Sequence, residues 1–226
     1  KHELTGKLDD ISELLDKAET TGDMLKREYA SQFKPFVKQA TYLAKKYDVV
    51  VANPPYMGTK GQNTLLRKFL QEKYTNVKSD LFSAFIEQNL YFTKAGGKLG
   101  FMTPFVWMFI SSYEALRNEI IEQYDLTSLV QLEYSGFDGA TVPICSFTLA
   151  NQHIKNKKNC FIKLSDFRGA DNQSPKTLEA INNRECGWFY ETEPGKFSSI
   201  PGSPIAYWVS EKLRNAFSDA EVLGNI

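Results

Sequence analysis

The chain has 226 residues, 42% of them hydrophobic and 24% charged, and its basic and acidic residues are equal in number. This composition predicts an ordinary soluble globular protein with one core and part of another, and zero net charge argues against a strong nucleic-acid clamp over the whole chain. The longest apolar stretch, 101–110, is too short to cross a bilayer, and three scattered cysteines with two histidines indicate neither disulfides nor a metal site. We therefore expect a cytoplasmic protein with no membrane partner and no metal.

The first segment, residues 1–46, predicts two helices. Apolar residues recur at helical spacing from Leu8 to Ala18, and a polar break ends at Asp23, a residue type that caps helices well. We expect the second helix to kink near Pro35. The segment carries no recognisable chemistry, so it is either packing material or an insertion before the strand that follows.

The next segment, Tyr47–Ala52, predicts a strand. Its three consecutive valines, 49–51, indicate a strand buried on both faces, as in a parallel sheet covered by helices. Pro54 and Pro55 end it, because neither has an N–H and each fixes φ near about −65°. Ligands of open α/β sheets bind beyond the carboxyl ends of the strands, so Asn53–Tyr56 is expected to form a rigid turn at a binding edge.

This turn offers two oxygens and an aromatic ring to a planar amine. The Asn53 side-chain oxygen and the Pro54 carbonyl can each accept one N–H of an exocyclic NH₂, and Tyr56 can stack on the ring. The simpler alternative is that the prolines only end a strand and Asn53 caps a turn. Any NH₂ beside a carbonyl or ring nitrogen suits the two acceptors, so protein glutamine and guanine N2 of RNA remain open alongside adenine.

A basic run follows the turn. Only Glu72 opposes its five cations, which are Lys60, Arg67, Lys68, Lys73 and Lys78. Such a run is either a solvated helix face or a set of phosphate contacts, for which Lys60, Arg67 and Lys68 are the candidates.

The middle of the chain alternates between helix and strand. The expected elements are a helix from a Ser79 cap through Phe92 to a basic turn and glycine stop at 94–97, a strand at 99–102, a helix from a Ser111–Glu114 capping box to about Tyr124, and strands at 126–132 and 144–149. This alternation is typical of a doubly wound α/β sheet.

The pattern changes at about residue 155. We expect a polar turn at 155–159, an edge strand at 160–164, a loop at 169–176 and a short amphipathic helix through Leu213 and Phe217. The aromatic residues between 188 and 208 are either a base-stacking platform or, the reading we favour, the core of a small subdomain.

The segment Asp48–Tyr56 resembles motif IV of the N6-adenine DNA methyltransferases. Wider similarity at 47–58, 79–82 and 200–208 resembles the PglX-type methylases of BREX phage-defence systems and the related type II restriction–modification methylases. The resemblance implies a partial Rossmann-like methyltransferase sheet whose last strand is antiparallel. It also implies a catalytic part at 47–154, between the helical segment 1–46 and an α+β extension at 155–226 that leads to a target-recognition domain.

The resemblance also implies residue roles. Asn53–Tyr56 would be catalytic, Asn53 and Pro54 would contact S-adenosylmethionine, and Phe137 would stack on the adenine face opposite Tyr56 after the base leaves the duplex. From the sequence alone, Phe137 could equally be a hydrophobic plug under a glycine-rich hairpin. The implied partners are double-stranded DNA and other defence-system subunits.

One part of the family pattern is missing. A glycine-rich loop after a first strand normally holds the amino-acid end of S-adenosylmethionine, but only Gly6 and Gly22 precede Asn53 and neither follows a strand-like run. We therefore expect a fragment whose cofactor half lies in the full-length parent, and which alone is inactive. The remaining non-enzymatic alternative is a DNA-recognition or scaffold module of a defence complex.

Overall fold

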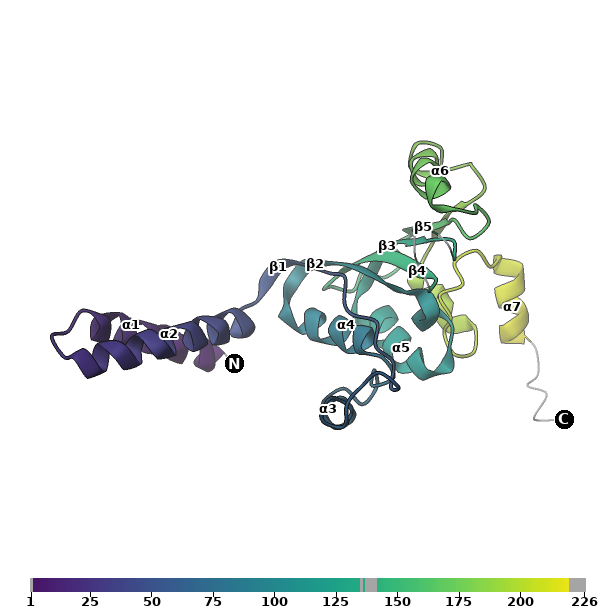
Figure 1. Ribbon diagram of the computed structural model, residues 1–226. Coiled ribbons are helices and arrows are strands. Elements are labelled where there is room, and N and C mark those ends of the chain that lie inside the picture. The colour runs from purple at the N-terminus through teal and green to yellow at the C-terminus, as the bar shows by residue number, and fades with distance from the viewer. Residues whose placement is uncertain (1, 135, 137–141, 220–226) are drawn as a thin grey trace. The chain divides into compact units, whose positions relative to one another are not determined.

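The computed structural model describes residues 2–134, 136 and 142–219 (Figure 1), which divide into two units, 1–47 and 48–226. In the first unit, α1 (His2–Glu19) packs against α2 (Met24–Ala44). The Asp23 carboxylate caps α2 by accepting the Leu25 and Lys26 N–H groups, as predicted. The helix continues through Pro35 to Ala44.

The second unit is built on one six-stranded sheet of order β1-β2-β4-β3-β5-β6. Its strands are β1 (Tyr47–Ala52), β2 (Thr93–Pro104), β3 (Asp125–Gln131), β4 (Ile144–Ala150), β5 (Asn159–Lys163) and β6 (Phe189–Thr192). Its helices are α3 (Thr64–Lys73), α4 (Leu81–Phe92), α5 (Glu114–Gln123), α6 (Ala170–Asn182) and α7 (Glu211–Asp219), with short 3₁₀ turns η1 (Phe105–Met108), η2 (Ser111–Tyr113) and η3 (Pro194–Ser199).

The strand directions confirm the predicted α/β class. β4 lies between β2 and β3 and is antiparallel to both, as the methyltransferase resemblance implies, while β5 is parallel to β3 and β6 antiparallel to β5. β1 runs in the direction of β2, because Gly97 faces the Asp48 carbonyl and Gly100 faces Val51. The carboxyl ends of β1 and β2 therefore meet at one edge.

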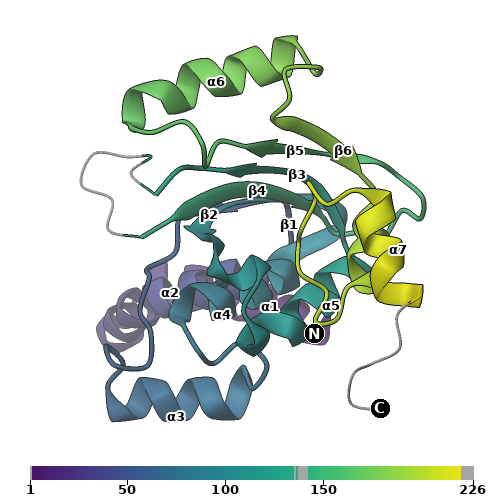
Figure 2. The ribbon, with the colours of Figure 1, turned by 90° about the vertical axis from the view of Figure 1, so that its right-hand side faces the viewer.

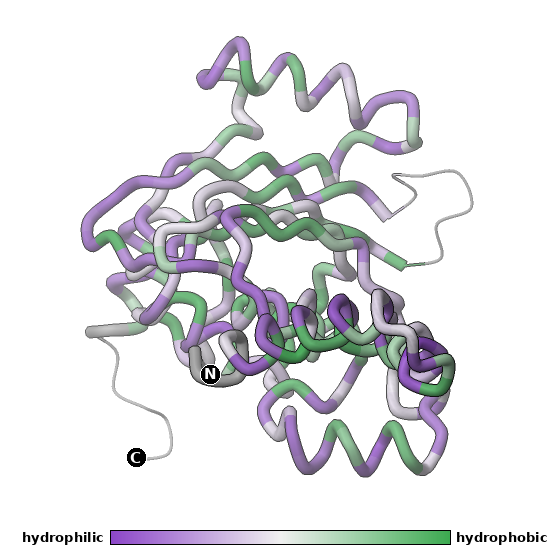
Figure 3. The backbone as a smooth tube through the Cα atoms, turned by 90° about the vertical axis from the view of Figure 1, so that its left-hand side faces the viewer, coloured by the Kyte–Doolittle hydropathy of each residue, from purple (hydrophilic) through white to green (hydrophobic). Residues whose placement is uncertain are grey.

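The main core lies between one face of the sheet and the helices α4 and α5. Its largest members include Phe82, Trp107, Ile120 and Phe147, all at most 1% exposed. Figure 2 shows α3, α4 and α5 on one side of the sheet and α6 on the other, and Figure 3 shows hydrophobic residues along much of the strands. Burial of this face is the main force that holds the unit together.

The aromatic residues near the carboxyl end are core residues, as we favoured, but they do not form the core of a small subdomain of their own. Most of them pack in this main core, and Trp188 and Phe189 pack against a smaller second cluster. Tyr207 is buried and stacks on Phe161 with 4.9 Å between ring centroids, and Phe197 meets the same ring edge-on at 5.8 Å. The residues after 155 thus contribute β5, β6 and these rings to the same sheet and core.

The expectation that the valines of β1 are buried on both faces is wrong. Val49 is 63% and Val51 is 77% exposed. β1 is the end strand of the described sheet, and Val51 lies against Gly100, whose neighbours Leu99 and Phe101 point into the core on the other face. The valine run therefore identified the strand but not its surroundings.

Three predicted helix boundaries are also wrong. Asp80, rather than Ser79, is the N-cap of α4, and the helix ends at Phe92 because β2 begins at once at Thr93. Gly97 serves strand pairing instead of a helix stop, since a methyl group there would lie 2.9 Å from the Asp48 carbonyl oxygen. The capping box expected at Ser111 does not form, since residues 111–113 make a 3₁₀ turn and α5 starts at Glu114 without a side-chain cap.

Two elements near the carboxyl end differ from prediction as well. The strand predicted at an edge, β5, is internal because β6 pairs with its outer side. The predicted loop at 169–176 is part of α6, whose first turn is held by Gln173 Nε2 donating to the carbonyls of Phe167 and Gly169. The helix accommodates Pro175 within its length.

Arg117 of α5 joins three separated segments through a buried guanidinium. The residue is 1% exposed, and its Nη1 donates to the carbonyls of Trp107 at 2.8 Å and Ile110 at 2.7 Å, while Nε donates to those of Gly202 and Ser203 at 3.0 and 3.1 Å. Burial lowers the pKa of this group, and nearby Glu114 opposes that shift. Arg117 thus fastens segment 200–208 to the turn that follows β2.

Within the described part of the chain, no helix is both long and apolar enough to cross a membrane.

Substituting Arg117→Ala should lower the free energy of unfolding by about 3 kcal/mol or more, because buried carbonyls would lose their donors. Urea denaturation would measure the change. The control is Arg184→Ala, which removes an exposed ion pair with Glu191 and should cost less than about 1 kcal/mol. Equal effects of the two substitutions would contradict the assigned role of Arg117.

Candidate active site

The predicted turn Asn53–Tyr56 lies at the surface, at the carboxyl end of β1. Asn53 and Pro55 are exposed, Tyr56 is 37% exposed, and Pro54 is buried. The buried proline anchors the turn, and the exposed amide and ring beside it are accessible to a ligand. Asn53 and Tyr56 therefore have the accessibility that the sequence prediction requires, whereas Pro54, whose carbonyl is the second predicted acceptor, is buried.

The hydroxyl of Tyr56 links the corner to the neighbouring strand. It lies 3.3 Å from the Asn53 side-chain oxygen and 3.3 Å from the Met102 carbonyl oxygen, so its one proton is shared between two distant acceptors. Among the described residues, no group donates a hydrogen bond to the Pro54 carbonyl. Both oxygens assigned to an incoming NH₂ thus retain capacity to accept.

Two aromatic residues of the main core support the Tyr56 side of the corner. Phe82 meets Tyr56 at 87° with 6.5 Å between centroids, and Tyr113 lies 5.6 Å from Phe82. Burial is the main reason that the pKa of the Tyr113 phenol is raised to about 12, and burial also raises the pKa of Tyr56. These phenols are therefore neutral at physiological pH and act as packing and hydrogen-bonding groups.

The residue after the corner, Met57, is hydrogen-bonded on both sides of its backbone. Its N–H donates to the Asp80 carboxylate at 2.8 Å, and its carbonyl accepts from the Leu81 N–H and the Gln62 side chain, both at 3.1 Å. Sequence reasoning missed Asp80, although an Asp before an apolar helix is a common cap signal. The adjacent Ser79 carried the same signal and was chosen instead.

A shallow groove of about 480 Å³ lies beside the corner on the sheet face opposite α4. It is lined by three short stretches of adjacent strands, 51–53, 100–102 and 146–148. A methyl group at Gly100 would lie 2.9 Å from Val51, so glycine keeps the strands close there. S-adenosylmethionine carries an ammonium, a carboxylate and a ribose diol, and the groove supplies no charged side chain to hold them. The described residues therefore do not complete a site for that cofactor.

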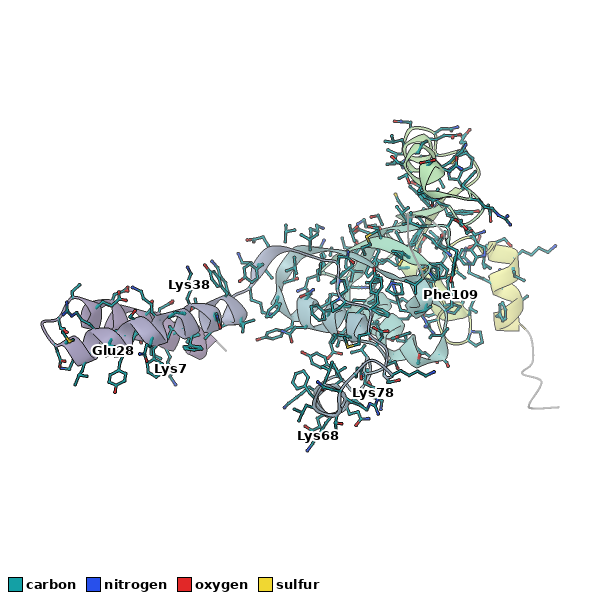
Figure 4. All side chains as sticks on the ribbon, viewed as in Figure 1. Lys7, Glu28, Lys38, Lys68, Lys78 and Phe109 are labelled. Carbon is teal, nitrogen blue, oxygen red and sulfur yellow. The ribbon has the colours of Figure 1, made fainter. Side chains whose placement is uncertain are left out.

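The three predicted phosphate contacts differ in their surroundings. Lys60 and Lys68 are exposed, and Lys68 makes only a long 3.9 Å contact with Glu72 as it projects from α3 (Figure 4). Arg67 instead donates to the Thr59 carbonyl at 2.6 Å and so braces the loop after the corner. Phe137, predicted to stack on the base, lies outside the described residues.

A family model described as the Eco57I restriction-modification methylase matches residues 3–137, more than half of the chain. The chain belongs to the Eco57I restriction-modification methylase family. This family match covers both the helical hairpin and the Asn53–Tyr56 corner, and it confirms the resemblance inferred from motif IV.

Named relatives of the family agree with this assignment. The chain is 36% identical over 206 residues to the adenine-specific methyltransferase BrxX of Escherichia coli O9:H4 (strain HS), covering 90% of this chain and 17% of that protein. It is 32% identical to the adenine-specific methyltransferase PglX of Lacticaseibacillus casei (strain Zhang), covering 80% of this chain and 15% of the relative. The chain thus spans less than a fifth of either relative.

A solved structure shares the fold. A nuclease-deletion mutant of the Type ISP restriction-modification enzyme LlaGI, in complex with a DNA substrate mimic, matches with a TM-score of 0.59 and 14% identity. The match covers 89% of this chain and 18% of that chain.

Alkaline pH should weaken the fold through Tyr113. Its phenol titrates near 12 in the folded protein and near 10.0 when unfolded, so the stabilisation is complete below about 10 and is lost as the pH rises toward 12. Urea unfolding at about pH 9 and pH 11 should show a smaller loss for Tyr113→Phe than for the parent. A loss in Tyr113→Phe as large as that of the parent would contradict this role.

Proposed function

We propose that this chain carries the adenine-binding corner of an S-adenosylmethionine-dependent DNA adenine-N6 methyltransferase of a restriction–modification or phage-defence system. The observation that carries the proposal is a pair of acceptors with spare capacity at a sheet edge. They are the side-chain oxygen of the exposed Asn53 and the carbonyl of the buried Pro54, to which no described group donates. The adenine-specific names of the relatives support the same substrate.

The corner acts by positioning and electrostatics. The lone pair of the adenine N6 is delocalised into the ring, which makes the nitrogen a poor nucleophile. Two acceptors that each take one N–H draw the nitrogen toward tetrahedral geometry and stabilise the positive charge that grows on it. The bound cofactor supplies the methyl group. The methylated nitrogen carries a positive charge and is strongly acidic, so it would release one proton to water, and this role needs no general base with an unusual pKa.

Tyr56 stacks on the extruded base in this proposal. Its 37% exposed ring leans against Phe82 and is fixed at its hydroxyl by the Met102 carbonyl, so its orientation is set before a base arrives. Stacking of this kind contributes about 1–3 kcal/mol per base and offsets part of the few kcal/mol needed to flip a nucleotide. Phe137 is proposed for the opposite face of the adenine.

Double-stranded DNA is the proposed partner, with Lys60 and Lys68 as phosphate contacts. Arg67 is a weaker candidate for that role because its guanidinium already braces Thr59. Other defence-system subunits are proposed as further partners. Because the chain spans less than a fifth of its relatives, we propose that the remaining contacts to S-adenosylmethionine, beyond Asn53 and Pro54, come from another part of a longer enzyme.

The substitution Asn53→Ala, made in a longer methyltransferase that carries this chain, should abolish or strongly reduce adenine methylation. Loss of one preorganised electrostatic partner typically costs about 10²–10³ in kcat. Mass spectrometry of genomic N6-methyladenine, in a host without other adenine methylases, would measure the loss. The control is Asn63→Ala, which removes the nearby cap of α3, and unchanged methylation in Asn53→Ala would defeat the proposal.

Replacing both Lys60 and Lys68 with alanine should weaken DNA binding and make the remaining affinity less dependent on salt, because two phosphate contacts are lost. Each lost phosphate contact should lower the slope of log affinity against log salt by about 0.9, giving a change of about 2. Fluorescence anisotropy with duplex DNA at several salt concentrations would measure the slope. The paired control replaces Lys26 and Lys38, exposed lysines of the first unit, and an equal change there would exclude a local contact.

A further inference from the structure

We infer that Asp80 is a positioning residue for the catalytic corner, acting through the backbone of Met57. The inference rests on the proposed function and identifies a further residue on which that site depends. Asp80 does not touch the substrate in this account. Its carboxylate fixes the point where the chain leaves the Asn53–Tyr56 turn.

A single carboxylate oxygen joins two segments. Asp80 Oδ1 accepts the Met57 N–H at 2.8 Å and the Phe82 N–H at 3.2 Å, so the atom that caps α4 also holds the residue after Tyr56. The 2.8 Å contact is in the range of a charge-assisted hydrogen bond. An antiparallel bridge between Gly58 and Asp80, with the Leu81 N–H donating to the Met57 carbonyl, reinforces the link.

The other side-chain caps behave differently. Among the residues that the structure describes, the Asp23 side chain accepts backbone N–H groups from Leu25 and Lys26 of its own helix alone, and the Asn63 side chain from Leu66 of α3 alone. Capping alone therefore requires no contact beyond the helix. The reach of Asp80 to Met57, 23 residues earlier, goes beyond what capping requires.

The link connects the corner to a helix that is packed into the main core. α4 contains Phe82 and Ile86, both at most 1% exposed, so its first turn is fixed by the core. Phe82 also supports the ring of Tyr56. The first turn of α4 thus holds two parts of the corner. Phe82 supports the Tyr56 ring, and Asp80 holds the backbone of the next residue, Met57.

The side chains that could replace Asp80 separate its two roles. Asparagine keeps a carbonyl oxygen at the same place, so it can accept both N–H groups without the charge. Serine and threonine are also good N-caps, but their hydroxyl is closer to the backbone and cannot span to Met57. Asp80→Asn therefore keeps both contacts, whereas Asp80→Ser and Asp80→Thr keep only the cap.

The first measurement is amide hydrogen exchange on the 226-residue chain. In Asp80→Ser, we expect Met57 to lose protection while the interior amides of α4 keep theirs, and Asp80→Asn should keep both. Asn63→Ala should leave Met57 protected. If Met57 is as protected in Asp80→Ser and Asp80→Thr as in the parent, the inference is overturned.

The second measurement is the kinetics of adenine methylation in a longer enzyme that carries the chain, with unmethylated genomic DNA as substrate. We expect Asp80→Ser to lower kcat by about 100-fold, the cost of displacing a reacting group by about 1 Å, with an unchanged KM for DNA. Asp80→Asn and Asn63→Ala should remain close to the parent. Full activity of Asp80→Ser, or equal losses in Asp80→Ser and Asp80→Asn, would overturn the inference.

Asn53→Ala separates this inference from the proposed function. If Asn53→Ala methylates normally, the proposed function fails whatever Asp80→Ser does. If Asn53→Ala is inactive while Asp80→Ser is fully active, the proposed function stands and only the role of Asp80 fails.

Discussion

The close approach of β1 to β2 is the constraint on which the site depends. The two strands run in the same direction, and at Gly97 and Gly100 there is no room for even a methyl group. This pairing brings the end of β1 beside the end of β2, so that Tyr56 can reach the Met102 carbonyl. Without it, the Asn53 turn would be an unsupported loop, because β1 has no other neighbour in the described sheet.

The corner combines a backbone that is held in place with a functional side chain that is exposed to solvent. Pro54 is buried and Met57 is held through both its N–H and its carbonyl, whereas Asn53 between β1 and these anchors is exposed. In the proposed function, the accepting oxygens need only be placed correctly, so a rigid backbone would serve in place of an activated base. The phenols of Tyr56 and Tyr113 are neutral, so they contribute packing to the fixed part of the corner and no charge.

The sequence predicted best where local chemistry decides the outcome. The strand before Asn53, the Asp23 cap, the antiparallel β4 and the family all follow from short patterns or from motif IV. The predictions failed where contacts between distant segments of the chain decide the structure. Val49 and Val51 look like core residues but lie at the end of the sheet, and β5 looks like an edge strand until β6, almost 30 residues later, pairs with it.

Capping residues show a second limit. Ser79 and Asp80 are equally good caps in sequence, and the choice between them is made by Met57, which lies more than 20 residues upstream. Ser111 and Glu114 have the spacing of a capping box, yet a 3₁₀ turn occupies that position. Tertiary contacts of this kind cannot be read from a four-residue window.

The position of β4 has a consequence for how the protein is made. β3 and β4 are close in sequence and can form their antiparallel pair early. β2, whose other neighbour is β1, pairs with the far side of β4 and joins Met102 to Ser146. During synthesis on the ribosome, the strand that carries Met102 must therefore wait until residues 144–150 have emerged. The Asn53–Tyr56 turn contacts that strand through the Tyr56 hydroxyl, so it should be among the later parts of the unit to reach its final shape.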